Sequence, residues 1–568
     1  MSGRNYVNED SSALRFPSLN TFRLPAPIPE WPEGQGFATG LINLGEIEVA
    51  AITTFEFIWG SHLSHDKNSC VSFYKPVGIP EGFFCFGHYC QLNSDPLNGY
   101  VLIAKYVVPP VMESGNNSGP SQTAAFMLPI DYTLVWISDD GMGIFDPRGY
   151  FWLPEAPPGY KPLGFLVTNK PRKPDLYEVR CVREDLTDKC EISSLLLETQ
   201  SKFQKIPFRV EKFRPCDRGM HGKGVSVGTF ICSSSSTRGG NMPIACLKNL
   251  DPKLHAMPTL VQIHALIQHY GPTIFFHPNE LYLPCSVSWF FKNGALLFKA
   301  GQSDGEPIDG EGSNLPAGGT NNGKFWIDLP DGIHQREIVK RGDLDGAEVY
   351  VHVKPALGGT FTDLAMWIFC PFNGPGTLKI GPTNIAMAMI GEHVGDWEHF
   401  TLRLSNFSGE LDSIYLSQHN GGVWIRPWEL EFIEGNRAVV YSSRSSHACF
   451  PHPGTYLQGS SMLSLGVRND CARSSFILDC STHYKIVAAE YLGENGVVEP
   501  SWLQFMGGWG PKFIYDSRAE LDKIIIRLPY LVQFSVASLL SQFPTELFGE
   551  EGPTGPKEKG NWVGDERW

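Results

Sequence analysis

The sequence predicts a mainly β protein, with an N-terminal β-prism of pseudo-threefold repeats and a C-terminal β-sandwich decorated by a few helices. Three observations support this fold class: short strand-like runs separated by turns, a repeated aromatic–proline–glycine unit in the N-terminal part, and a composition typical of folded, loop-rich proteins. The chain is 42% hydrophobic and 19% charged, with 59 Gly and 43 Pro. A mainly disordered chain would have fewer apolar residues and more charge, so that class is excluded.

The N-terminal repeat consists of an aromatic strand ending at Pro, a turn, and a second strand ending at Gly. The three copies, the last of them weaker, are Phe73–Gly87, Phe151–Gly164 and Phe213–Gly228. In the first two copies the turn has the form P-x-G or P-P-G, where Pro fixes φ and Gly permits a positive φ. Three small sheets cannot each bury a face alone, but three sheets packed about one axis can. The repeat therefore predicts a β-prism.

A Ser- and Gly-rich stretch after this region predicts a connection, and the pattern then changes. Apolar residues spaced three and four apart predict a helix from Pro258 to Gly271 and a second from Ser517 to Leu528. Between them, Leu364–Cys370 is apolar on both faces and Glu398–Leu404 alternates, as strands of a sandwich do.

These patterns divide the chain into four parts. We expect a β-prism-like domain in residues 1–235, a linker in 236–257, a β-sandwich domain with helices in 258–548 and a polar, surface-wrapping tail in 549–568.

Charge and apolar content exclude several classes of protein. The formal net charge is −14 and no long Lys/Arg run occurs, so we expect no nucleic-acid partner. The N-terminus has no apolar core of a signal peptide, and the longest apolar stretch near the C-terminus, Ile524–Leu540, is interrupted by Arg, Pro and Gln. The 13 Cys include no C-x-x-C pair, which favours reduced thiols. We therefore expect a cytoplasmic protein without a signal peptide or a transmembrane helix.

The densest group of polar residues lies before and within the alternating strand. Imidazole and carboxylate groups are ordinary ligands of divalent transition metals. Alternation on a strand puts Glu398 and His399 on opposite faces, so one strand cannot offer both to a single ion. A metal site would need His residues from neighbouring segments. The candidate ligands are His393, Asp396, His399, His419 and His447. A polar turn that satisfies backbone donors at a strand entry is the favoured alternative, so no cofactor is expected.

The sequence offers no catalytic residue set. The one G-x-S-x-G match, Gly224–Gly228, lacks the helix of a nucleophile elbow, and neither a phosphate-binding loop nor H-E-x-x-H occurs. Loops on a rigid scaffold are common binding sites, so aromatic residues near the predicted prism turns are candidate binding residues. These are Phe83, Phe84, Trp152 and Tyr160.

The chain resembles the plant vacuolar protein sorting-associated protein 62 family, formerly a plant domain of unknown function. The motifs that carry the resemblance run over nearly the whole chain and include Pro154–Tyr160, Tyr270–Pro278, His393–His399, Ser446–Gly454 and Gly549–Pro556. The resemblance implies a plant origin, a β-prism-like N-terminal half of the membrane-associated kind, and a role in protein transport. The architecture is also similar to that of insecticidal crystal toxins, although a shared fold does not determine function.

These observations favour a non-enzymatic protein that binds a membrane lipid, a glycan or a trafficking protein. Such a protein could act peripherally at endosomal or vacuolar membranes and could form a homo-oligomer. Two alternatives stay open. One is a membrane-active, pore-forming-like plant defence protein, whose insertable element would be Leu260–Tyr270 or Ile524–Leu540; the other is a metal-dependent hydrolase built on His393, Asp396 and His399.

Overall fold

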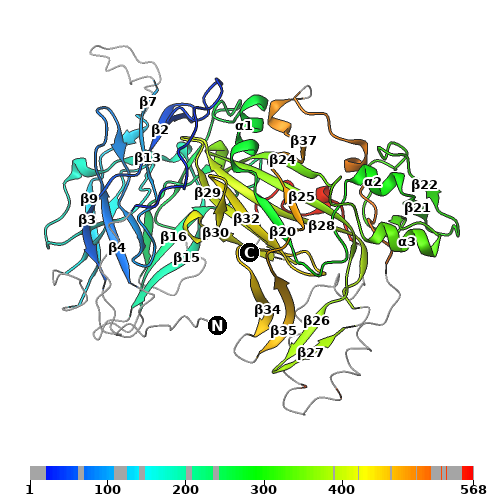
Figure 1. Ribbon diagram of the computed structural model, residues 1–568. Coiled ribbons are helices and arrows are strands. Elements are labelled where there is room, and N and C mark those ends of the chain that lie inside the picture. Colours follow the sequence, from blue (N-terminus) through cyan, green and yellow to red (C-terminus); the bar gives the residue numbers. More distant parts are fainter. Residues whose placement is uncertain are drawn as a thin grey trace.

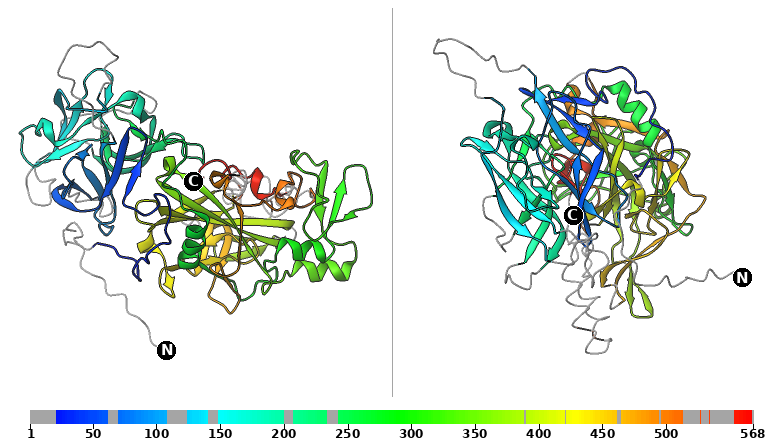
Figure 2. Two further views of the ribbon diagram at one scale, coloured as in Figure 1. Left: turned by 90° about the horizontal axis from the view of Figure 1, so that it is seen from above. Right: turned by 90° about the vertical axis from the view of Figure 1, so that its left-hand side faces the viewer.

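Strands dominate both halves of the computed structural model, which confirms the mainly β class (Figure 1). The N-terminal and C-terminal halves lie side by side in all views (Figure 2). The structure describes residues 21–61, 70–107, 124–139, 148–199, 207–233, 242–387, 390–419, 421–460, 464–493, 496–512, 526, 533 and 553–566.

The N-terminal half repeats one six-strand pairing scheme three times. In each repeat the first, sixth and fourth strands form one sheet (β2-β7-β5, β8-β13-β11, β14-β19-β17), and the second, third and fifth form another (β3-β4-β6, β9-β10-β12, β15-β16-β18). The bounds are β2 Ile47–Ile52, β3 Phe55–Gly60, β4 Val71–Pro76, β5 Phe84–Cys85, β6 Tyr89–Leu92, β7 Val101–Tyr106, β8 Phe126–Met127, β9 Asp131–Ile137, β10 Tyr150–Glu155, β11 Tyr160–Lys161, β12 Leu166–Thr168, β13 Cys181–Arg183, β14 Thr187–Asp188, β15 Cys190–Thr199, β16 Phe208–Pro215, β17 Gly224–Val225, β18 Phe230–Ser233 and β19 Cys246–Lys248. β1, Leu41–Asn43, pairs with β2.

The repeats meet in a shared aromatic core. The Phe73 ring lies 5.1 Å from the rings of both Phe151 and Phe230, so aromatic residues from all three repeats are in contact. The predicted closing glycines come together as well. A Cβ on Gly87 would lie 3.1 Å from the Cα of Gly164, so the two glycines pack closely and a side chain on Gly87 would push its neighbour away. The three predicted copies therefore correspond to three packed structural units.

The third repeat extends past the predicted boundary at residue 235. Its last strand, β19, pairs with both β14 and β17 and completes the third first-sixth-fourth sheet. The predicted linker of residues 236–257 therefore contains part of the N-terminal unit. Sequence reasoning missed this strand because it has only three residues.

The C-terminal half is built on a six-stranded sheet of order β30-β29-β28-β25-β24-β37. One face packs against the sheet β31-β32-β20-β36 and the helix α1, forming a sandwich core. The other face packs against α2 and several Trp residues, so the central strands are buried on both faces. The bounds are β20 Thr273–Phe276, β24 Val349–Ala356, β25 Phe361–Asn373, β28 His393–Ser405, β29 Leu411–Gln418, β30 Gly421–Ile425, β31 Phe432–Ile433, β32 Arg437–Ser442, β36 Ile477–Asp479, β37 Tyr484–Ala488, α1 Leu260–Tyr270 and α2 Val287–Lys292.

Two smaller sheets flank this sandwich. One has the order β27-β26-β35-β34, the other β22-β21-β23, and α3 lies near the second (Figure 1). β33 pairs with β32. The bounds are β21 Leu296–Lys299, β22 Glu306–Pro307, β23 Phe325–Asp328, β26 Thr377–Ile380, β27 Thr383–Ala386, β33 Cys449–Phe450, β34 Gly454–Ser460, β35 Leu465–Cys471 and α3 Ile333–Lys340.

The first predicted helix is confirmed as α1. It begins after Thr259, whose side chain forms a reciprocal capping box with Gln262, and its apolar face is buried in the sandwich core. The second predicted helix, 517–528, lies outside the described residues except at residue 526. Within the described part of the chain, no helix is long and apolar enough to cross a membrane.

Both ends of the described chain pack on the C-terminal half. The Trp31 indole N–H donates to the carbonyl of Ser408 at 3.1 Å. At the other end, residues 553–566, here named the tail, cross the aromatic face of the six-stranded sheet, with Trp562 and Glu566 buried. The predicted polar tail is therefore, in this part, a packed element, because its few large side chains find partners on the sheet.

Candidate functional site

A cavity of about 740 Å³ opens where β28 begins and the antiparallel β29 ends. Its walls come from the six-stranded sheet, the β26–β27 and β34–β35 hairpins, the segment after β20, the loop before β33, and the tail. The polar and aromatic residues that carry the argument below are Glu280, Tyr282, Trp367, His393, Asp396, Trp397, Glu398, His399, Tyr415, Ser417, His419, Ser445, Glu558, Lys559 and Glu566.

Two carboxyl groups on one face of β28 form the polar centre of this cavity. Asp396 and Glu398 are two residues apart on the strand, so their side chains project to the same side. Asp396 Oδ2 lies 2.7 Å from Nδ1 of His447, whose Nε2–H donates to the carbonyl of Tyr282 at 2.8 Å. The Ser417 hydroxyl donates to Glu398 Oε2 at 2.5 Å.

The pKa values of the two carboxyl groups are shifted in opposite directions. Burial, together with the charge of Asp396, raises the pKa of Glu398 to about 8. Burial also acts to raise the pKa of Asp396, but the hydrogen bond from His447 and the charge of His393 lower it below its usual range. At neutral pH the cavity thus contains a neutral carboxyl group, which can donate a hydrogen bond, beside an ionised one, which only accepts.

Strained backbone supports these side chains. His419, Ser445 and His447 have φ values of 57°, 70° and 54°. Left-handed backbone costs a non-glycine residue about 1 to 3 kcal/mol and concentrates at functional sites. Here the strain is supported by hydrogen bonds: the Ser445 N–H donates to a Glu280 carboxylate oxygen at 2.6 Å, and the His419 ring lies 3.1 Å from the Asn469 side-chain oxygen.

Within the described part of the chain, three buried polar atoms in residues that line the cavity have no hydrogen-bond partner. They are Nε1 of Trp367, Nε1 of Trp397 and Oε2 of Glu558. Leaving a buried polar atom unpaired costs about 1 to 3 kcal/mol. The residues around the cavity thus carry two unpaired indole donors and one unpaired carboxylate acceptor. Stacked rings lie beside them: Trp367 on His399 at 4.4 Å, and His399 on Tyr415 at 5.7 Å.

The structure brings together only some of the predicted metal ligands. His393 and His447 lie 3.9 and 2.7 Å from oxygens of Asp396. His399 is on the other face of β28, as its alternation predicts, and binds Glu566 at 3.0 Å. The His419 ring faces Asn469. In the described residues no group of three or more His, Cys, Asp or Glu side chains has an arrangement that could hold a metal ion. Asp396 and His399 lie on opposite faces of β28, so a hydrolase that uses both on one metal ion would need them to move together.

The predicted prism tips are less exposed than expected. Phe83 and Phe84 are half-buried, under Lys105 and Arg180 at 5.0 and 4.6 Å from the ring centres. Tyr160 is also half-buried and its hydroxyl donates to the Ala124 carbonyl at 2.7 Å. Trp152 is 3% exposed within β10, with its indole N–H donated to Thr168. The expectation that Trp152 lies at an exposed tip is therefore wrong, because both faces of β10 are covered and Trp152 packs with Tyr132, Leu166 and Val179.

Sequence reasoning missed most of the cavity. Trp367 and Tyr415 lie on strands whose apolar pattern reads as ordinary core, and Glu566 lies in a segment expected to be polar surface. Two signals were present in the motifs: Ser446–Gly454 contains His447, and Gly549–Pro556 leads into the tail. Neither motif indicates which distant residues it contacts.

Comparison with known proteins places these features in context. The sequence profile of the family described as vacuolar protein sorting-associated protein 62 matches residues 18–566. Vacuolar protein sorting-associated protein 62 of Saccharomyces cerevisiae is 27% identical over 246 residues, which cover 37% of this chain and 50% of that protein. The putative vacuolar protein sorting-associated protein TDA6 of the same yeast is 25% identical over 181 residues, 27% of this chain and 36% of that protein. The chain thus spans half or less of the curated relatives it matches.

Two solved structures that resemble part of this chain superpose on it only weakly. GNIP1Aa from Chromobacterium piscinae is 16% identical with a TM-score of 0.28 and covers 40% of each chain. NLPPya in complex with glucosamine is 14% identical with a TM-score of 0.19, over 33% of this chain and 65% of that one. These similarities are too low to carry an argument about function.

Proposed function

Because the chain belongs to the vacuolar protein sorting-associated protein 62 family, we propose that it is a non-enzymatic binding protein of vacuolar sorting that holds a polyhydroxylated ligand, such as the end of a glycan, in the cavity at β28. The family supports the sorting role, and the chemistry of the cavity supports the ligand class. The N-terminal half, in this proposal, contacts the membrane or the trafficking partner.

The observation that carries the ligand class is the set of unpaired buried polar atoms in the cavity lining. The Trp367 and Trp397 indoles can only donate, whereas Oε2 of Glu558 accepts. A hydroxyl group donates and accepts at once, so a molecule with several hydroxyl groups matches a site that carries both unpaired donors and an unpaired acceptor. The volume of about 740 Å³ lies in the usual range of small-ligand sites.

Charge argues against an anionic ligand. Acidic side chains outnumber basic ones in the lining: seven (Glu280, Glu392, Asp396, Glu398, Asp470, Glu558 and Glu566) against three (Arg444, Arg468 and Lys559). A phosphate or carboxylate group would be repelled by each acidic group that is ionised. A neutral polyol avoids this cost.

Calorimetric titration of the full chain with N-acetylchitotriose, mannotriose and maltotriose tests this proposal. The decisive variant is Trp367→Phe, which keeps an aromatic ring but removes the donor. One lost neutral hydrogen bond should weaken binding about five-fold to ten-fold. Trp509→Phe is a matched control, because the Trp509 indole nitrogen is also buried and unpaired but its residue does not line the cavity. Absence of binding by the unmodified chain, or equal losses in the two variants, would contradict the proposal.

A further inference from the structure

We propose that the tail is a movable wall of the ligand cavity, that ligand binding and tail docking stabilise each other, and that Asp565 transmits this coupling to the N-terminal half. The inference rests on the proposed ligand and adds the regulation of that site.

The tail contributes directly to the cavity. Glu558, Lys559, Asn561 and Glu566 all belong to its lining. The charge of Lys559 acts to lower the pKa of both Asp396 and Glu398. If the tail left the sheet, the cavity would lose one side and one of its three basic side chains, Lys559, at the same time.

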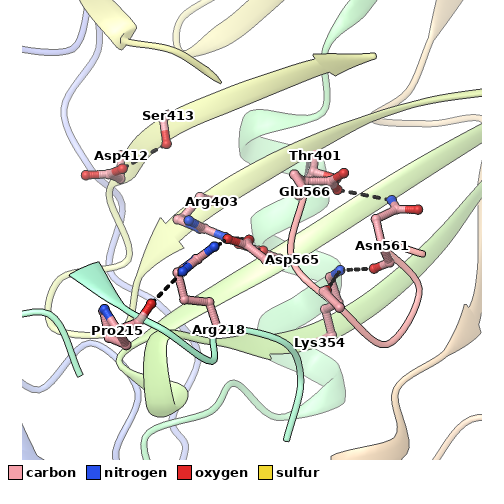
Figure 3. Close-up of polar contacts among 12 residues, drawn as sticks. Pro215, Arg218, Lys354, Thr401, Arg403, Asp412, Ser413, Asn561, Asp565 and Glu566 are labelled. Atoms are coloured by element: carbon pink, nitrogen blue, oxygen red, sulfur yellow. Dashed lines mark hydrogen bonds and ion pairs between the residues drawn. The ribbon is translucent and has the colours of Figure 1, made fainter. Parts of the chain in front are cut away.

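The anchor of the tail lies inside the site. Glu566 accepts a hydrogen bond from the Thr401 hydroxyl at 2.6 Å, and its other oxygen lies 3.0 Å from Nε2 of His399 (Figure 3 shows the contact with Thr401). Both His399 and Glu566 line the cavity, so a ligand that touches this wall touches the docked tail. Lys354 adds hydrogen bonds to the backbone carbonyls of Asn561 and, at 3.0 Å, Gly564.

The neighbouring residue joins the two halves of the protein. Asp565 accepts from Arg403 of β28 at 2.9 Å and from Arg218 of the N-terminal half at 2.8 Å (Figure 3). The backbone strengthens this connection, because the Met220 N–H donates to the Val563 carbonyl at 2.9 Å. One carboxylate thus links the sheet that carries the ligand site to the N-terminal half.

Linkage determines the sign of the effect. A ligand that contacts the docked tail binds the docked state more tightly, so it shifts the tail towards docking. The coupling free energy is the same in both directions, so weakening the docking weakens the binding of that ligand once it lowers the docked fraction of the tail. Loosening Asp565 should therefore lower ligand affinity although this residue is not part of the cavity lining.

The test uses the full chain, the three oligosaccharides named above and hydrogen exchange of residues 553–566. Asp565→Asn weakens the contacts to both Arg218 and Arg403. Glu198→Gln is the matched control, because Glu198 pairs with Arg209 at 2.8 Å on the N-terminal half, outside the tail contacts. We expect Asp565→Asn to speed amide exchange in the tail at least ten-fold and to weaken binding of the best oligosaccharide at least five-fold. Glu198→Gln should change neither, and bound oligosaccharide should slow tail exchange in the unmodified chain.

The outcomes separate the two proposals. If Asp565→Asn frees the tail but leaves affinity unchanged, or if the bound oligosaccharide does not slow tail exchange, the coupling is refuted while the ligand site stands. If the tail of Asp565→Asn exchanges as slowly as that of the unmodified chain, the contacts of Asp565 do not hold the tail in place and the inference is also refuted. If the unmodified chain binds none of the oligosaccharides, the ligand proposal fails and the coupling with it.

Discussion

Replacing Arg403 by Met should destabilise the C-terminal half strongly. The Arg403 guanidinium binds both oxygens of Asp363 at 2.8 Å, and the exposed fractions of the two side chains are 11% and 1%. Without this cation, Asp363 becomes a buried carboxylate that has lost its hydrogen-bonded charge partner. Removing one member of a buried ion pair costs about 3 to 5 kcal/mol. Met retains the apolar stem of the side chain, so most of this loss reflects the missing charge.

The remaining carboxyl group limits the loss and provides a second test. Burial already raises the pKa of Asp363, although Arg403 acts to lower it. In Arg403→Met the group should therefore take up a proton, and the double variant with Asp363→Asn should recover about 1 to 3 kcal/mol, because position 363 no longer carries a charge to bury. Urea unfolding followed by tryptophan fluorescence measures both changes. A loss below 1 kcal/mol in the single variant, or a double variant that is no more stable than the single one, would refute this reasoning.

Three further predictions concern pH, packing and metal. Burial acts to raise the pKa of Glu566, but the charge of His399 and the hydrogen bond with His399 lower this pKa to about 2. Because the folded pKa is below the usual 4.5, ionised Glu566 contributes about 3 kcal/mol to stability above pH 4.5, and this stability is lost as the pH falls towards 2. Urea unfolding between pH 5 and pH 2.5 should show a shallower dependence in Glu566→Gln, and equal slopes would contradict the assignment. Gly164→Ala should cost about 1 to 3 kcal/mol, because its Cβ would lie 2.6 Å from that of Thr229, whereas Gly332→Ala, with no atom nearer than 3.9 Å, should leave the melting temperature unchanged; equal melting temperatures would argue against close packing between the repeats. Treatment with EDTA should leave the melting temperature within 1 °C, because Asp396 and His399 are hydrogen-bonded to His447 and Glu566 rather than to a metal ion (about 4 °C corresponds to 1 kcal/mol in a small domain). A larger drop, together with stoichiometric metal in elemental analysis, would support the predicted metal site.

Local patterns in the sequence predicted much of the framework. The turn units at Gly82 and Gly159 indicated the repeats, because turn geometry depends on φ values that Pro and Gly impose locally, and these glycines have φ of 83° and 82°. The spacing of apolar residues and the capping signal at Thr259 predicted α1. Alternation along β28 correctly separated His399 from Glu398.

Local patterns predicted the remaining features less well. They did not reveal β19, since a three-residue strand has no period to detect. They also predicted Trp152 to be exposed, although it is buried in the structure. Both errors arise where the partner strand, rather than the segment itself, determines the structure.

The sequence by itself determined that the chain is mainly β, that its N-terminal half is a threefold repeat, and which residues share a strand face, because each of these depends on neighbours a few residues apart. Only the tertiary structure decided that there is a cavity at the end of β28 and that the tail forms part of its wall. The contacts that create it join residues far apart in the chain: His447 with Asp396 across 51 residues, and His399 with Glu566 across 167. No local period carries such a pairing, since it depends on how the sheets pack and where the tail crosses them.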